Sequence, residues 1–224
     1  MSLPKLWEKF SELTRLVRED HRNARHLVGH GHDFAHALMV AQYAQLIASE
    51  QHEGELGWAA GLMHNTDHLF GEEKVNEIME GYLVHVLFSP ADKNLVCEAV
   101  LTHSEIDSPK DNPISIILKD ADKLANIGES VILRSGQFRP DITAMDPRFL
   151  KFSDPKATYR NPRSLLQDLR HILQWETMMR TEKARMISKP YFDRLRSFID
   201  HCPDQFEESG LTPYPFPEDF ESSN

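Results

Sequence analysis

Apolar residues recur at three- and four-residue spacing along most of this chain, and this pattern limits its fold more than any other feature. The first stripe consists of Leu3, Leu6, Trp7, Phe10, Leu13 and Val17. A later stripe consists of Leu165, Leu166, Leu169, Ile172, Leu173 and Met179. Such spacing places apolar side chains on one face of an α-helix, and the alternation typical of strands is nearly absent. The pattern therefore predicts an all-α protein.

Capping residues mark the starts of several expected helices. Beyond the first stripe, helices are expected over residues 34–52, 55–66, 72–87, 89–104, 114–127, 129–138, 163–188 and 190–207. Asp33 is a favourable N-cap, and a proline follows Ser89 and Asn112 at two later starts. We expect one helical domain over residues 1–208. A Pro-rich acidic tail at 209–224 is expected to be extended or disordered.

Two segments interrupt the helical pattern. Gly29 and Gly31 predict a turn before the helix that starts at residue 34. Residues 139–162 contain four prolines and show no clear period. Loops of this length in a compact domain are usually functional or mobile.

Composition and charge exclude several classes of protein. The formal net charge of −10 disfavours a face that binds duplex nucleic acid. Cys97 and Cys202 form neither a metal-type pair nor a disulfide framework, which suits a reducing cytoplasm. No apolar run approaches the roughly 18 residues of a membrane span, and the first residues lack the apolar core of a signal peptide. We expect a cytoplasmic protein that does not bind membranes, and exposed apolar positions on the first helix permit a homodimer.

The histidines are the strongest candidates for chemistry. The chain has 12 of them, and His36, His64, His85 and His103 fall on helix faces expected to be interior. A single buried histidine is usually a hydrogen-bonded core residue. Several from different helices, together with an aspartate, favour a metal site, because imidazole and carboxylate are ligands that Zn, Mn and Fe share. Of the two aspartates in "LKDADKL", Asp120 is expected to accept a hydrogen bond.

Four short motifs in this order resemble the HD-domain phosphohydrolase superfamily. They are "HALMVA" (36–41), "GLMHNTDH" (61–68), "VLTHSE" (100–105) and "LKDADKLANIG" (118–128). The resemblance covers roughly residues 25–200 and implies a helical bundle of the HD type. It implies that His36, His64, the residue at position 65 and Asp122 bind a divalent metal ion, with Mn, Fe, Ni, Co, Zn and Mg as candidates. The reaction implied is hydrolysis of a phosphate ester, of a nucleotide or another small molecule, by a metal-bound water.

Position 65 departs from the family, because Asn65 stands where the family has aspartate. The amide oxygen of asparagine can still ligate a metal, but it brings no negative charge. In one interpretation Asp67 compensates, since residues three apart on one helix share a face. In a second, the pocket binds a nucleotide or phosphate ligand without hydrolysing it. In a third, the domain binds a protein partner through the 139–162 loop and the acidic tail.

Further residues receive expected roles from the same resemblance. Catalytic roles are assigned to Asn65, Asp67 and Lys123, and contacts with substrate phosphate to His32, His103, Lys123 and His85. Four of them have an ordinary structural alternative: helix capping for Asp67, core packing for His85 and His103, and a solvated helix position for Lys123.

Overall fold

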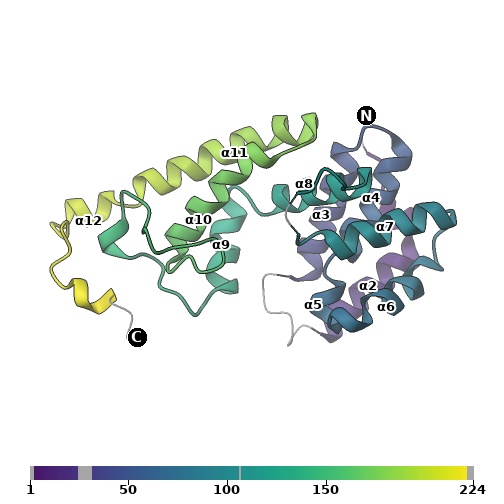
Figure 1. Ribbon diagram of the computed structural model, residues 1–224, viewed down its shortest axis with the longest axis horizontal. Helices are drawn as coiled ribbons and strands as arrows, with labels where there is room; N and C mark the ends of the chain where they lie inside the picture. Colours follow the sequence, from purple (N-terminus) through teal and green to yellow (C-terminus); the bar gives the residue numbers. More distant parts are fainter. Residues whose placement is uncertain (1–2, 25–31, 106, 221–224) are drawn as a thin grey trace. The chain divides into compact units, whose positions relative to one another are not determined.

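A computed structural model describes residues 3–24, 32–105 and 107–220 (Figure 1). Contacts between Cα atoms group these residues into two compact units. The first contains the described residues up to Asn126 together with Met178–Ile187, and the second contains Ile127–Thr177 and the described residues from Ser188 onward. Both units are helical, so the predicted all-α class is confirmed. The predicted domain boundary at residue 208 stays a prediction.

The helices of the first unit carry the candidate site. They are α1 (Leu6–Lys9), α2 (Ser11–Asn23), α3 (Phe34–Ile47), α4 (Gln51–Met63), α5 (Thr66–Phe70), η1 (Glu72–Lys74), α6 (Val75–Leu83), α7 (Pro90–Thr102) and α8 (Pro113–Ala125). α3, α4 and α8 pack directly on one another. Their shared core includes the fully buried side chains of Trp58, Met63 and Leu118.

The second unit follows α8 in the chain. Its elements are α9 (Glu129–Phe138), η2 (Pro147–Phe149), α10 (Leu165–Ile172), α12 (Asp204–Glu208) and η4 (Pro217–Phe220). Two elements, η3 (Leu173–Met178) and α11 (Glu182–His201), have residues in both units. None of the described helices is long and apolar enough to cross a membrane.

The predicted helix starts are confirmed by local hydrogen bonds. Asp33 Oδ1 accepts the backbone N–H of His36 at 2.8 Å and caps α3. Ser89 and Asp92 form a reciprocal capping box at α7. Asn112 Oδ1 accepts two backbone N–H groups at α8, and Pro113 takes the first helical position. The predicted turn at Gly29 and Gly31 lies outside the described residues.

Small residues let α4 approach α3 closely. Ala59 and Ala60 are fully buried. A Cβ added at Gly61 would lie 2.7 Å from the Cα atom of Ala41 on α3, closer than real Cβ contacts allow. The backbones of α3 and α4 therefore meet at a distance that glycine alone permits, which fixes the spacing between the elements that bear His36 and His64.

The predicted helices at 163–188 and 190–207 are wrong in their boundaries. The chain forms α10, the 3-10 segment η3 and then a new helix, α11, which includes Pro190. The break occurs where the buried carboxylate of Asp120 accepts the backbone N–H groups of Arg180 and Thr181. This confirms the expected hydrogen-bond acceptor role of Asp120. Because its partners lie about 60 residues away in sequence, local periodicity could not indicate the break.

Candidate metal centre

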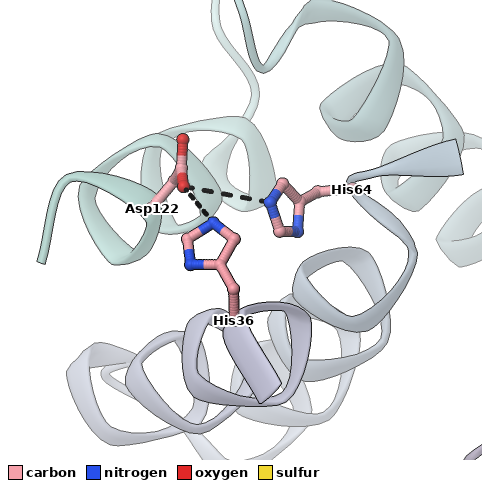
Figure 2. A group of neighbouring side chains, drawn as sticks. All are labelled: His36, His64 and Asp122. Carbon is pink, nitrogen blue, oxygen red and sulfur yellow. Dashed lines mark ion pairs between the residues drawn. The ribbon is translucent and has the colours of Figure 1, made fainter. Parts of the chain in front are cut away.

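Three side chains from different helices meet in the first unit (Figure 2). His36 lies in the first turn of α3, His64 follows the last residue of α4, and Asp122 lies on α8. Asp122 Oδ1 is 3.3 Å from His36 Nε2 and 3.9 Å from His64 Nε2. One ligand atom from each residue lies within 4.8 Å of the others. The structure therefore brings together three of the four predicted ligands.

A backbone hydrogen bond holds the His64 ring in a metal-binding orientation. His64 Nδ1 lies 2.7 Å from the backbone oxygen of Gly61. Because a carbonyl oxygen can only accept, the ring N–H is on Nδ1 and the lone pair is on Nε2, which faces Asp122. His103 makes the same bond to the backbone oxygen of Val100, and its ring centroid is 5.5 Å from that of His64. Such second contacts fix the tautomer that a ligand needs.

The protonation states of the group also suit a cation. Burial holds the pKa of His64 well below its ordinary value, so this ring is neutral near pH 7. Burial on its own raises the pKa of Asp122, but the hydrogen bond from His36 and the neighbouring His64 outweigh it and leave the pKa far below its usual range. Neutral imidazole and ionised carboxylate are the forms that bind metal. The donor set therefore fits a divalent metal ion.

Asn65 is fully buried beside this group. Its Oδ1 accepts a hydrogen bond from His32 Nδ1 at 3.2 Å, and its Nδ2 is buried with no hydrogen-bond partner among the described residues. The His32 ring in turn stacks on His68, with ring centroids 4.1 Å apart. Asn65 is thus held by an imidazole that the chain supplies from the segment before α3.

Asp67 lies outside the three-residue group. The expectation that His64 and Asp67 share one helix face is wrong, because α4 ends at Met63 and a new short helix, α5, begins at Thr66. Asp67 Oδ1 instead accepts the backbone N–H of His68 at 2.8 Å. The role of Asp67 as a compensating carboxylate stays a prediction.

Lys123 directs its ammonium to a carboxylate. Its Nζ donates to both oxygens of Asp107 at 3.0 and 3.1 Å, and Arg180 Nη2 lies 3.5 Å from Asp107 Oδ1. Sequence reasoning missed Asp107 and Arg180, because an ion pair between distant segments leaves no local pattern. The expected contact between Lys123 and substrate phosphate stays a prediction.

The remaining candidates divide into near and distant positions. His32 and His103 lie beside the group through the ring and hydrogen-bond contacts given above. His85, expected on an interior face, is exposed after α6 instead. Among the described contacts, none links His85 to the metal group, and its predicted contact with substrate stays a prediction.

Comparisons with known proteins agree with this fold. The HD domain family model matches residues 33–127, which include His36, His64, Asn65 and Asp122. No curated protein matches the sequence.

Solved bacterial structures share the architecture. A Lactobacillus plantarum protein is 16% identical with a TM-score of 0.68, over 94% of this chain and 100% of its own. Bacillus subtilis YpgQ, solved in complex with ADP, is 17% identical with a TM-score of 0.65, over 88% and 95%. A Bacillus thuringiensis HD-superfamily hydrolase is 20% identical with a TM-score of 0.61, over 91% and 97%. At these identities the likeness shows a common fold.

Proposed function

We propose that this protein, whose residues 33–127 form an HD domain, is a metal-dependent phosphohydrolase acting on a nucleotide or another small phosphate ester. The observation that carries the proposal is the convergence of His36, His64 and Asp122 from three helices, with one ligand atom from each within 4.8 Å. Helical bundles build metal sites in this way, from inward side chains of neighbouring helices.

The three residues would hold the cation through two imidazole nitrogens and one carboxylate oxygen. A divalent ion in such a site lowers the pKa of a coordinated water and polarises a phosphoryl oxygen. The protein's own contribution is to keep His64 neutral by burial and to fix its ring by the hydrogen bond to Gly61. Asp122 supplies the negative charge, and its side chain remains 30% exposed, which leaves access from solvent.

A nucleotide substrate is supported by one structural neighbour. YpgQ of Bacillus subtilis has been solved in complex with ADP, and its fold matches most of this chain. Lys123 would provide a positive charge for the substrate phosphate, once its ammonium leaves Asp107 and binds a phosphate oxygen. His32 and His103 would contact the substrate from positions beside the metal group. We further propose that the protein acts in the cytoplasm.

The hydrogen bond between Asn65 and His32 favours a second candidate function. Asn65 adds no negative charge, so a metal bound by this group would have one carboxylate ligand, Asp122. An aspartate at position 65 would provide a second carboxylate. The alternative is a weakened or inactive HD domain that binds a nucleotide or a protein partner without hydrolysis. The two candidates differ in whether added metal produces turnover.

The decisive experiment begins with the metal content of protein purified without a His tag. Thermal stability is then measured with added Mn²⁺, Ni²⁺, Zn²⁺ and Mg²⁺, followed by phosphate release from ADP and p-nitrophenyl phosphate. A bound metal raises Tm by mass action, and His64→Ala should abolish both the shift and the activity. His52→Ala is the matched control, because His52 is an exposed histidine on α4 that pairs with Asp92 away from the group. If the wild-type protein neither binds metal nor releases phosphate, the proposed phosphohydrolase function is contradicted.

Asn65→Asp separates the two candidate functions. If the native site is a weakened one, the added charge should increase metal affinity and turnover together. If Asn65 is an adapted ligand, the substitution should lower both. An unchanged metal affinity would show that position 65 lies outside the donor set. Circular dichroism of each variant confirms that the fold is retained.

A further inference from the structure

The second unit contains a cavity of about 580 Å³. Its walls come from α9, the segment before η2, α10, the C-terminal part of α11 and α12. Every lining residue belongs to this unit, and none belongs to the metal group. Interiors normally leave few voids larger than a water molecule, whereas small-molecule sites occupy roughly 300–1,000 Å³. The volume is that of a ligand site.

The lining is apolar and uncharged. The lining includes the buried side chains of Leu166 and Leu169 and the exposed side chain of Phe198. Among the described lining residues there is no aspartate, glutamate, lysine or arginine, although 27% of the chain is charged. Burying a charged ligand without a partner is costly, so this lining selects against ions.

A few polar groups interrupt the apolar wall. Ser135 is buried, and its hydroxyl oxygen has lone pairs that can accept a hydrogen bond from a ligand. His201 and Ser197 are exposed on the last turns of α11. An apolar cavity with a small number of such groups is the usual composition of a site for a small organic molecule.

We propose that this cavity binds an uncharged, predominantly apolar small molecule. The ligand would cover the exposed face of Phe198, rest on Leu166 and Leu169, and carry one hydrogen-bond donor that Ser135 accepts. This site is separate from the metal centre, and the proposal does not rest on the phosphohydrolase function. A protein that binds no metal would therefore not contradict the proposed apolar site. A protein that binds no apolar ligand would not contradict the proposed phosphohydrolase.

Two dyes that share a ring system test the ligand class. N-phenyl-1-naphthylamine is neutral and has one N–H donor, and 1-anilinonaphthalene-8-sulfonate is the same molecule with a sulfonate. Titrated into the folded full-length protein, the neutral dye should bind saturably at one site and at least tenfold more tightly than the sulfonate. No saturable binding of the neutral dye, or equal affinity for the two, overturns the proposal.

A substitution at an exposed lining residue tests where the dye binds. Ser197→Trp places a bulky ring at an exposed position that lines the cavity, and should weaken the neutral dye at least tenfold. Asp193→Trp adds the same ring one turn earlier on α11, at an exposed position outside the lining, and should leave the affinity unchanged. Equal affinity in the two variants would place the dye elsewhere and overturn the assignment.

Cys202 offers a second readout, because it lines the cavity and lies partly buried. In a Cys97→Ser background, reaction of Cys202 with a disulfide reagent such as 5,5′-dithiobis(2-nitrobenzoate) should slow as the neutral dye saturates. The reciprocal Cys202→Ser protein reports on Cys97, which lies on α7, and its reaction rate should not change. Protection of Cys97 instead of Cys202 contradicts the proposed site.

Discussion

Gly61→Ala tests whether the close approach of α3 and α4 sets the metal geometry. The new Cβ would lie 2.7 Å from Ala41 Cα and 2.8 Å from Ala41 N, whereas ordinary contact begins at 3.4 Å. These neighbours are backbone atoms and cannot rotate away, so α3 and α4 must separate by roughly 0.7 Å. Overpacking of this kind costs about 1–3 kcal/mol, partly offset by the ~1 kcal/mol that alanine gains over glycine in a helix.

The displacement matters more for the metal than for the fold. His36 lies on α3, and the backbone oxygen of Gly61 itself orients His64. Metal–ligand distances tolerate about ±0.2 Å, so a shift several times larger should weaken metal binding about tenfold or more. Isothermal titration calorimetry with Mn²⁺ or Ni²⁺ measures the affinity, and thermal unfolding without metal measures stability.

Gly81→Ala is the control for this prediction. Gly81 lies inside α6, and a Cβ built there meets nothing within 4 Å. Alanine should therefore raise stability slightly, by up to ~1 kcal/mol, and leave metal affinity unchanged. A Gly61→Ala protein with lowered Tm but native metal affinity would refute the link between helix spacing and the site. Native values of both quantities would refute the close packing itself.

Three further predictions concern stability. Asp120→Ala leaves two partly buried backbone N–H groups without their acceptor, and should lower the free energy of unfolding by about 1–3 kcal/mol in urea titrations. Lys119→Met leaves Asp111 with Arg180 and the backbone N–H of Ser108 as its remaining partners. We expect a loss of about 1–3 kcal/mol in the free energy of unfolding, and no measurable loss would contradict a stabilising ion pair. Burial keeps the pKa of His64 well below 6.5 and lowers the pKa of His32 to about 4. Below pH 6.5 these histidines therefore bind protons in the unfolded chain but not in the folded one, so the Tm of the metal-free protein should fall as pH drops from 7 to 4. In His64→Gln the fall should be less steep.

The helix starts that the sequence predicted correctly depend on contacts between near neighbours in the chain. Asp33, Ser89 and Asn112 each satisfy backbone N–H groups two or three residues ahead, so the residue type and its position were sufficient. The candidate metal group is different, because its members come from three helices and no local rule relates them. The resemblance to a family supplied that relation, and the structure places His36, His64 and Asp122 together.

The errors arise where a distant partner overrides local pattern. Apolar residues continue to Met179, yet Asp120 binds the backbone of the next two residues and a new helix starts after them. A distant partner also holds Lys123, whose ammonium pairs with Asp107; its expected contact with substrate phosphate stays a prediction. The position of Lys123 in the sequence places its Cα beside that of Asp122. Its long side chain nevertheless extends to an anion that the fold brings near from another segment.

Asn65 shows how such a distant partner bears on the chemistry. With aspartate at position 65, the N–H of His32 would meet a carboxylate, and the site would hold two negative charges beside His64. With asparagine, the same N–H meets a neutral amide oxygen, and Asp122 alone balances a divalent cation. The group then carries a net charge of +1 once a metal binds. This positive charge would favour an anionic phosphate over a neutral ligand, so a metal held beside Asn65 should attract such a substrate more strongly than one held beside an aspartate.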